Sequence, residues 1–557
     1  MSAPVRTPSP PTGTASVRGA PRLAGCGSLA RMALRRDRVR LIVWALLTLG
    51  ILVSLVSSVV RNQQTLAQRQ EYAAHIGDSA AAAAFSGPLY GLTTKGGIAV
   101  AEALTIIMFG MALGSLLLIV RYTRTDEETG RAELIASTGV SRYGRLAAAV
   151  VVVGGADLVL GAVSTLIMLA FGLPAPGCVA FGLVLTLVGW TFAGVGALFA
   201  QVFQHSRTAM GTSVAVFGAA LVLRAIGDAG LIADGRSPLR YLSWASPLGW
   251  AFEVRPYAGE RWWVAALMFA LAVVLVGAAA ALVVRRDIDA GLIPARLGRA
   301  RATPRFGSAW GLAWRLQRGG IAGWGVGIAL FAGVFGSFAV EMDDMARSGG
   351  SVDLLARLGG SRVPSDSWIA WTLSLAGMVS AIYVVSAVLR LRAEEDGLRT
   401  EMVLATAVGR RKWCAAHLVT AAVGVTVIMV ASGLVAGLVH GLRADDLGGQ
   451  LPRVLGGALV QVPAALLMAA VAFAVHAFLP RLTALAWVAV VGAVLLTQIG
   501  ASLRFDQAVL DISPFTHAPK APAAPVHAAP LLWFLGSAVL LAAAGLYRVG
   551  RRDIGVS

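Results

Sequence analysis

The sequence predicts an all-α polytopic membrane protein, with about twelve transmembrane helices arranged as two parallel six-helix repeats. Hydrophobic residues make up 57% of the 557 residues and the mean hydropathy is +0.74, both above the values typical of soluble domains. The apolar residues occur in blocks of about 20, the length at which a helix crosses a bilayer. A charged stretch also occurs twice, 268 positions apart, once in each half of the chain.

Twelve apolar blocks lie along the chain in two sets of six. The first set is expected near residues 41–60, 98–120, 146–171, 178–203, 209–232 and 262–284, and the second near 320–340, 368–389, 414–441, 454–479, 482–502 and 530–547. We therefore divide the chain into a disordered tail, a first repeat, a basic linker and a second repeat, at residues 1–26, 27–290, 291–306 and 307–557. The tail is rich in Pro, Ser, Thr, Gly and Arg and has almost nothing to bury.

The placement of Arg and Lys predicts the orientation of the chain. With the N-terminus inside, the segments between blocks carry 32 of these residues on the inner side and 14 on the outer side. We therefore expect a multi-pass protein of a bacterial cell (inner or plasma) membrane with both termini in the cytoplasm; the scarcity of lysine, with three residues, is typical of GC-rich bacterial genes. The net charge of +18 follows from the inner-side bias, and no nucleic-acid partner is expected.

The charged stretch covers residues 124–139 and occurs again as residues 392–407, each time between the second and third blocks of a repeat. Residues 131–136 favour a helix, because acids precede them and Arg142 and Arg145 follow, which suits the helix dipole. The pattern predicts a short amphipathic helix on the inner membrane surface, with a charged face that docks into a soluble partner. An ordinary charged loop is the alternative for either copy, but two matched copies favour the docking surface.

The candidate docking residues come from both copies. They are Asp126, Glu127, Glu128, Arg131, Glu133, Leu134, Ser137 and Thr138 in the first, and Glu394, Glu395, Asp396, Arg399, Glu401, Met402, Ala405 and Thr406 in the second. Glu128, Arg131 and Glu133 match Asp396, Arg399 and Glu401 in register.

We expect no catalytic site in this chain. A Walker A loop needs a Gly-Lys pair, and none of the three lysines follows a glycine. The seven His and three Cys are scattered and lack metal-ligand spacing. We therefore expect a chain that is not itself an enzyme and holds no cofactor or metal.

Three further landmarks recur in the same order in both halves. They are Gly27–Arg35 with Gly307–Arg315 before the first block, Ser246-Pro247 with Ser513-Pro514 before the last, and Arg285-Arg286-Asp287-Ile288 with Arg551-Arg552-Asp553-Ile554 after it. An even number of spans in each half makes the repeats parallel, related by an axis along the membrane normal, with room for a pathway between them.

Two outer segments have distinctive content. Residues 233–263 contain six Trp and Tyr residues with three prolines, which predicts short helices in the outer leaflet or dipping into it; a plain interfacial belt is the alternative. Residues 341–367 are polar and are expected to cap the outer side.

Few ionisable residues lie inside the blocks, and a charge near the bilayer centre costs about 2.5–3.5 kcal/mol on insertion scales. Asp157 lies near the middle of the third block and is the best candidate for lining a pathway; a bond to a neighbouring helix is the alternative. Arg224 and Asp228 are further candidates, and their spacing of four allows them to pair on one helix face. An interior with so few polar residues suits an apolar or amphipathic cargo.

With these blocks and two Glu-rich, Arg-containing stretches, the chain resembles an ABC-2-type exporter permease. More narrowly, it is similar to the fused two-repeat permeases of polyketide-antibiotic or tetronasin-type exporters. The segments Glu127–Leu134 and Arg399–Thr406 carry the resemblance, which covers residues 27–557.

The resemblance implies that the two short helices are coupling helices, each seated in its own ABC ATPase subunit. Those two subunits would bind ATP and Mg and hydrolyse ATP, while the permease exports a small hydrophobic or amphipathic, antibiotic- or drug-like molecule. Segments 233–263 and 503–529 would be re-entrant. Ala407 stands where the first copy has Gly139, and Leu404 where it has Ala136, which puts the equivalence of the two docking surfaces in doubt.

Two other function classes stay open. An ion-coupled secondary transporter needs carboxylates within the membrane, and among these residues only Asp157 is deep enough. That reading also leaves the repeated charged stretch unexplained. A membrane enzyme or a scaffold without transport is the third class; the lack of a catalytic cluster counts against the enzyme, while the scaffold stays open.

Overall fold

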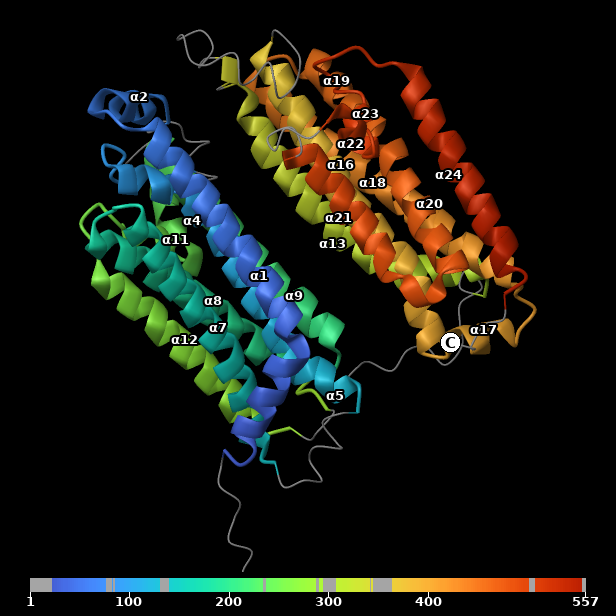
Figure 1. The fold of residues 1–557 in the computed structure, drawn as a ribbon, viewed down its shortest axis with the longest axis horizontal. Helices are drawn as coiled ribbons and strands as arrows, with labels where there is room; N and C mark the ends of the chain where they lie inside the picture. The colour runs from blue at the N-terminus through green and yellow to red at the C-terminus, as the bar shows by residue number, and fades with distance from the viewer. Residues whose placement is uncertain are drawn as a thin grey trace, which may run out of the picture. The chain divides into compact units, whose positions relative to one another are not determined.

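The fold is described here from a computed structural model. It describes residues 23–76, 83, 86–130, 140–233, 237–286, 290–293, 307–340, 342–343, 363–499 and 506–552. Within these ranges the chain is helical and contains no β-strand. The chain divides into two compact units, Met1–Leu297 (unit 1) and Gly298–Ser557 (unit 2), each a helical bundle in Figure 1. Almost all of the tail predicted to be disordered lies outside the described residues.

Eleven helices of the described chain are long and apolar enough to cross a bilayer, which confirms an all-α polytopic membrane protein. In unit 1 they are α1 (Cys26–Asn62), α4 (Lys95–Val120), α7 (Arg142–Ala170), α8 (Ala175–Val202), α9 (Ser206–Ala233) and α12 (Trp262–Val283). In unit 2 they are α13 (Ala309–Ser337), α16 (Pro364–Asp396), α18 (Arg410–Arg443), α19 and α20 together (Leu447–Val460 and Val462–Phe478) and α24 (Ala528–Val549). The block expected near 482–502 forms α21 (Ala484–Ile499), and residues 500–502 of this block lie outside the described residues.

Short helices connect the long ones. In unit 1 these are α2 (Leu66–Ile76), a π-helical turn (Arg121–Thr125) leading into α5 (Asp126–Glu128), a 3-10 turn (Pro238–Arg240), α10 (Tyr241–Trp244) and α11 (Pro247–Glu253). In unit 2 they are α17 (Arg399–Leu404), a 3-10 turn (Pro480–Leu482), α22 (Gln507–Leu510) and α23 (Pro514–His517). The segments 233–263 and 503–529 therefore contain short helices, as the first was predicted to. Most of the predicted outer cap at 341–367 lies outside the described residues.

The repeated Ser-Pro landmark makes the same contact in both units. Ser246 precedes α11, and its hydroxyl donates to the carbonyl of Ala220 on α9 at 2.6 Å. Ser513 precedes α23, and its hydroxyl donates to the carbonyl of Ala493 on α21 at 2.9 Å. Each serine also caps its short helix, and the proline suits the first helical position. The landmark thus ties the short helix before the last span to the fifth helix of each unit.

The core of unit 1 is built around α8, which packs against α4, α7 and α12. Small residues let these backbones approach closely. A Cβ atom on Gly161 of α7 would lie 2.4 Å from the carbonyl oxygen of Gly182 on α8. In unit 2, α18 packs against α13 and α19, while α20 packs against α16 and α24.

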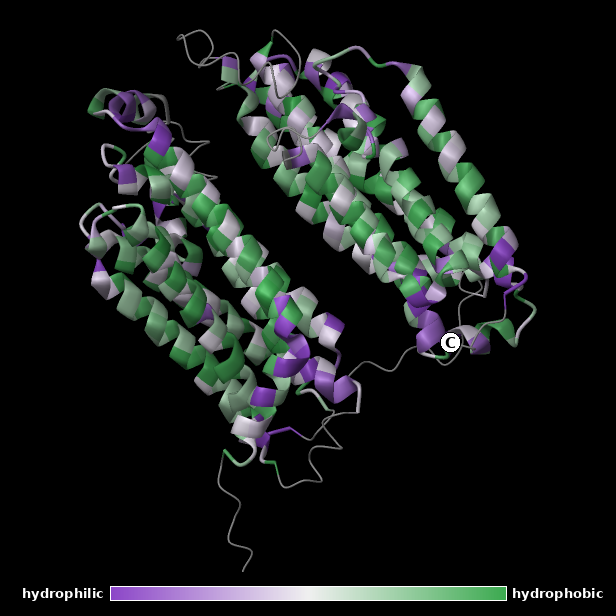
Figure 2. Ribbon diagram, in the orientation of Figure 1, coloured by the Kyte–Doolittle hydropathy of each residue, from purple (hydrophilic) through white to green (hydrophobic). Residues whose placement is uncertain are grey.

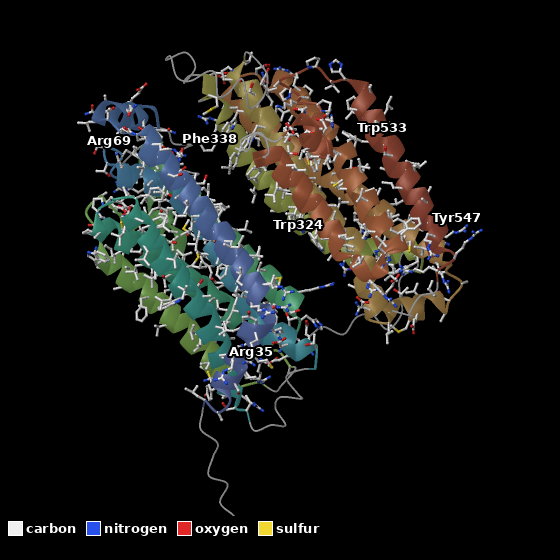
Figure 3. All side chains as sticks on the ribbon, in the orientation of Figure 1. Arg35, Arg69, Trp324, Phe338, Trp533 and Tyr547 are labelled. Carbon is white, nitrogen blue, oxygen red and sulfur yellow. The ribbon has the colours of Figure 1, made fainter. Side chains whose placement is uncertain are left out.

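The outer surfaces of the bundles carry large apolar side chains. On α24, Trp533 and Leu540 are 74% and 71% exposed, and Figure 3 shows Trp533 standing away from its helix. Figure 2 shows hydrophobic residues along the middle of the long helices of each unit and hydrophilic residues near many helix ends. Helix surfaces of this kind are stable in a bilayer and are a liability in water.

Candidate functional site

The first charged stretch continues the second span without a break. α4 passes through the π-helical turn into α5, so Asp126, Glu127 and Glu128 lie at the end of the span. Successive side chains on a helix point about 100° apart, so each acid meets a different neighbour. The remaining predicted docking residues of this copy lie outside the described residues; they are Arg131, Glu133, Leu134, Ser137 and Thr138.

Glu127 points into unit 1 and is 7% exposed. Arg286, three residues after the end of α12, donates two hydrogen bonds to its carboxylate at 2.8 and 2.9 Å. Arg124, which is fully buried, also donates to this carboxylate, and Arg145 of α7 lies 3.6 Å from it. Bidentate arginine pairing is among the stronger polar contacts in proteins. Glu127 therefore holds elements of its own unit together.

The two flanking acids bind other elements of the same unit. Asp126 accepts two hydrogen bonds from Arg36 of α1, at 3.0 and 3.1 Å. Glu128 accepts a hydrogen bond at 2.7 Å from the backbone N–H of Ser206, the first residue of α9, and another from its hydroxyl. A carboxylate is favourable at a helix N-terminus. The three acids thus tie the end of α4 to α1, α9 and the segment after α12.

Glu395 has the corresponding partner in unit 2. It lies in the last turn of α16, and Arg552, three residues after the end of α24, donates to both of its oxygens at 2.7 and 2.9 Å. The buried His476 of α20 lies 3.3 Å from the same carboxylate. The neighbouring Asp396 pairs with Arg392 at 3.0 Å, and its side chain is 55% exposed. The middle acid of each stretch therefore pairs with the arginine that follows the last span of its unit.

The helix α17 is anchored where it begins. Glu394 is buried in the last turn of α16 and accepts a hydrogen bond at 2.6 Å from Nε of Arg399, the first residue of α17. This hydrogen bond raises the pKa of Arg399 above its ordinary value, because the carboxylate of Glu394 favours the charged guanidinium. Leu398 between them has φ of 57° and turns the chain from α16 into α17.

The outer face of α17 is exposed and of mixed character. Met402 and Leu398 are 67% and 61% exposed, although both are large apolar residues. The other predicted docking residues of α17 and the turn after it are also exposed; they are Glu401, Ala405 and Thr406. The helix expected from the first copy at 131–136 thus has its equivalent at Arg399–Leu404 of the second.

A third residue completes each cluster. Arg142, the first residue of α7, donates to the carbonyl of Arg286 at 3.0 Å, and Arg410, the first residue of α18, donates to that of Arg552 at 2.6 Å. We call these groups the clasps: Glu127, Arg142 and Arg286 in unit 1, and Glu395, Arg410 and Arg552 in unit 2. Each clasp joins the end of the second span, the start of the third and the segment after the last.

Sequence reasoning found the acids but missed their partners. Arg286 and Arg552 belong to the Arg-Arg-Asp-Ile landmark, which indicates repetition but by itself no contact. The sequence did contain a sign of this contact. The basic Arg-Arg-Asp-Ile landmark occurs once for each copy of the acidic stretch, which makes it a candidate ion-pair partner. Arg36, Ser206 and His476 lie in no pattern that would have singled them out.

Asp157 is fully buried among α4, α7 and α8. Ser115 of α4 donates to its Oδ1 at 2.6 Å, and Oδ2 has no hydrogen-bond partner among the residues that the structure describes. A Cβ atom on Gly189 of α8 would lie 2.4 Å from the carboxyl group. The bond to a neighbouring helix is therefore observed, and a role in lining a pathway stays a prediction.

Arg224 and Asp228 pair on α9, with Nη1 3.6 Å from Oδ2, as their spacing predicts. Both side chains are 1% exposed. Ser243 of α10 donates to Asp228 at 2.6 Å, and the guanidinium of Arg224 lies 5.0 Å from the ring centre of Phe252 on α11. The pair thus connects the fifth span to the short helices before the last span, and a place on a pathway stays a prediction.

The groups that come together at the candidate site are carboxylates and guanidinium groups, which hold helices by charge and hydrogen bonding. Across the described ranges, no three His, Cys, Asp or Glu side chains are grouped in a way that could hold a metal ion.

Comparison with known proteins identifies the family. A family model described as the C-terminal domain of the multidrug efflux system permease Rv1217c matches residues 306–549. The multidrug efflux system permease protein Rv1217c of Mycobacterium tuberculosis strain H37Rv is 40% identical over 532 residues, which cover 95% of each chain. Identity at this level over nearly the full length shows common ancestry and a common fold. This chain therefore belongs to the family of multidrug efflux system permeases.

Proposed function

We propose that this permease is the membrane-spanning subunit of an ATP-driven exporter of the ABC-2 type, in the fused two-repeat form. It moves a hydrophobic or amphipathic, drug-like molecule out of a bacterial cell. Separate ABC ATPase subunits, one for each charged stretch, bind ATP and Mg and hydrolyse ATP. The observation that carries the proposal is α17, a short exposed helix held at the end of a membrane span by the ion pair between Arg399 and the buried Glu394.

The exposed face of α17 suits a protein partner. Met402 and Leu398 are apolar and exposed, and Glu401 adds a charge beside them. The charge of Glu401 does not suit a helix that faces lipid. The exposed side chain of Met402 does not suit a loop that faces only water. An apolar centre with a polar rim is the composition of a protein–protein interface. Met402 is accordingly the residue whose burial contributes most to docking.

The clasps support the transfer of movement from α17 to the spans. The clasp of unit 2 joins α16, α18 and the segment after α24, and Glu394 joins α17 to α16. A displacement of α17 by a partner therefore reaches three spans through fixed contacts. We assign Glu127 and Glu395 as positioning residues, because both face inward and neither offers a carboxylate to a docked protein.

Three further observations agree with this assignment. The relative in Mycobacterium tuberculosis is a multidrug efflux system permease. The chain lacks the Gly-Lys pair of a Walker A loop, which agrees with ATP being bound by a separate subunit. The excess of Arg and Lys predicts a cytoplasmic position for the clasps, α17 and both termini, on the side where ATP is available.

The docking face is tested by Met402→Glu. The tagged full-length chain is co-expressed with the ABC ATPase encoded beside it and purified in mild detergent, and the co-purified ATPase is quantified. The new carboxylate lies on the interface and loses its hydration when the partner binds, so we expect the recovered ATPase to fall at least tenfold.

The matched control is Ile512→Glu, which makes the same kind of change at an apolar residue that is 73% exposed and lies in the predicted outer segment. This variant retains the ATPase. Native recovery of the ATPase with Met402→Glu, or an equal loss with Ile512→Glu, would show that α17 is not the docking helix.

An ion-coupled transporter is the second candidate, and one observation favours it. Asp157 is a buried carboxyl group with one oxygen that has no partner among the described residues, which is a site where a proton can bind and leave. Such a carrier follows the proton gradient rather than ATP. It gives no account of α17 or of the two clasps.

A further inference from the structure

Four exposed cations lie at one end of unit 2, where α24 ends and α18 begins. The guanidinium groups of Arg551 and Arg411 lie 4.2 and 5.9 Å from the ring centre of the same tyrosine, Tyr547 of α24. Two further cations lie beside these residues in the chain, Lys412 and Arg548, and all five side chains are exposed. Figure 3 shows Tyr547 near the end of α24, where several side chains carry nitrogen. We call the four cations the basic patch.

The basic patch has no acidic partner in the part of the chain that the structure describes. None of its four residues forms an ion pair there. The arginines of the adjacent clasp are bound, because Arg552 pairs with Glu395 and Arg410 donates to a backbone carbonyl. Four like charges in one place repel one another, and an opposing charge lowers that repulsion. The patch therefore offers its charge to a partner outside this chain.

Unit 1 lacks most of the basic patch. Aligned on the clasp arginines, the four positions correspond in chain order to Tyr143, Gly144, Leu282 and Arg285. Only the last of these is basic. Unit 1 keeps its helical bundle, its clasp and its predicted orientation without the other three charges, so none of these features explains the patch in unit 2.

The basic patch continues a helix face that suits lipid. Trp533, Val539 and Leu540 of α24 are apolar and are 74%, 68% and 71% exposed. Tyr547 is 53% exposed and lies two turns beyond Leu540 on the same helix. An exposed tyrosine with basic neighbours at the end of an apolar span is typical of the headgroup layer. The molecule that lies beside such a face is a phospholipid.

We propose that the basic patch binds the phosphate headgroups of anionic phospholipids of the inner leaflet. Clusters of Arg and Lys immediately cytoplasmic of a membrane span attract such lipids. The bound headgroups hold the end of α24 and the start of α18 together, beside the clasp of unit 2. This inference does not depend on an ATPase partner, because it rests on residues of unit 2 alone.

Photocrosslinking in a membrane tests the proposal. The full-length chain is reconstituted into phosphatidylcholine vesicles that contain a little photoactivatable phosphatidylglycerol, and the labelled peptides are quantified by mass spectrometry. Residues 274–286, at the end of α12, are the internal control, because they correspond to residues 540–552 and contribute a single charge of the patch type. We expect residues 540–552 to be labelled at least about tenfold more, since each charge near the surface adds several-fold to the attraction. The phosphatidylcholine analogue should label the two segments equally.

A charge reversal within the patch provides the second measurement. Arg548→Glu should lower the labelling of residues 540–552 to the level of residues 274–286, while Arg548→Lys should leave it within about twofold. The matched control is Arg318→Glu, at an exposed arginine of α13 on the same predicted side, which leaves the labelling unchanged. An unaltered unfolding midpoint in lipid-free detergent shows that each variant is folded.

Three results would overturn the proposal. They are equal labelling of the two segments by phosphatidylglycerol, equal labelling of residues 540–552 by both lipids, and native labelling of a folded Arg548→Glu variant. The first two need no substitution, so they decide the matter even if a variant fails to fold. Native lipid labelling combined with loss of the co-purified ATPase in Arg548→Glu would assign the patch to a protein partner instead.

Discussion

Three consecutive acidic residues lie at the end of the α4 span and at the end of α16. The middle one makes the same contact in both units. Glu127 and Glu395 are 268 positions apart, and each receives two hydrogen bonds from the arginine that lies three residues after the last span of its unit. A carboxylate this deeply placed needs such a partner, because an unpaired buried charge is costly. In unit 1 both flanking acids are more exposed than Glu127, whereas in unit 2 Glu394 is also buried and binds Arg399.

Glu395→Gln should destabilise unit 2, because it leaves Arg552 without its carboxylate. Removing one partner of a buried pair costs about 3 kcal/mol or more. For a unit of this size we expect the unfolding midpoint in detergent to fall by roughly 6–12 °C. A thermal scan read out by size-exclusion chromatography measures it.

Asp396→Asn is the control for this prediction, since it changes the adjacent acid, which is 55% exposed and pairs within its own helix. Such a pair contributes about 0.5 kcal/mol, so the midpoint should move by roughly 1 °C. If the two variants behave alike, the clasp does not stabilise unit 2.

For single residues, the sequence could identify the charged stretch as a candidate site, but it could not show which direction each acid faces. Spacing along the chain places Asp126, Glu127 and Glu128 about 100° apart on a helix. It says nothing about a partner such as Arg286, 159 positions away. Only packing decides that the middle acid faces inward.

Hydropathy predicted the helices more accurately than the sequence motifs predicted the contacts between them. Each predicted block overlaps an observed helix, although the blocks at 320–340 and 482–502 run past the helix ends. α1 and α16 extend well past their apolar runs, because a helix continues into the polar layer while hydropathy reports only the bilayer part. α4 continues into α5 for the same reason. The break between α19 and α20 lies at Gln461, two residues before Pro463, and hydropathy did not predict it.

Close packing of α7 on α8 depends on glycine, and Gly161→Leu should disrupt it. The new side chain would meet the backbone of Gly182 and the hydroxyl of Thr186, at 2.4 and 2.1 Å from the Cβ position. Backbone cannot move aside cheaply, so overpacking here costs about 3 kcal/mol or more. We expect a lower yield of folded protein and a lower unfolding midpoint.

Gly155→Leu provides the comparison on the same helix. Gly155 is exposed, and nothing lies within 4 Å of its Cβ position. This variant should match the unaltered chain in yield and in unfolding midpoint. Equal damage from both substitutions would mean that the contact with α8 is not what makes Gly161 necessary.

For the whole molecule, repetition of sequence landmarks corresponds to repetition of contacts. The charged stretch, the Ser-Pro pair and the Arg-Arg-Asp-Ile landmark each make an equivalent contact in unit 1 and in unit 2. The two clasps therefore make equivalent contacts, one within each unit. The resemblance stated from the sequence led correctly to an efflux permease, while the ATP-driven ABC-2 assignment stays a proposal.

The most direct test of that proposal is to measure which energy source drives transport. Inside-out vesicles containing the chain and its neighbouring ABC ATPase are loaded from outside with a fluorescent amphipathic drug, and uptake is followed with ATP or with a proton gradient. We predict uptake that requires ATP, persists when an uncoupler abolishes the gradient, and is lost with Met402→Glu. Uptake that needs no ATP, stops with the uncoupler and is lost with Asp157→Asn would contradict the account and identify an ion-coupled carrier.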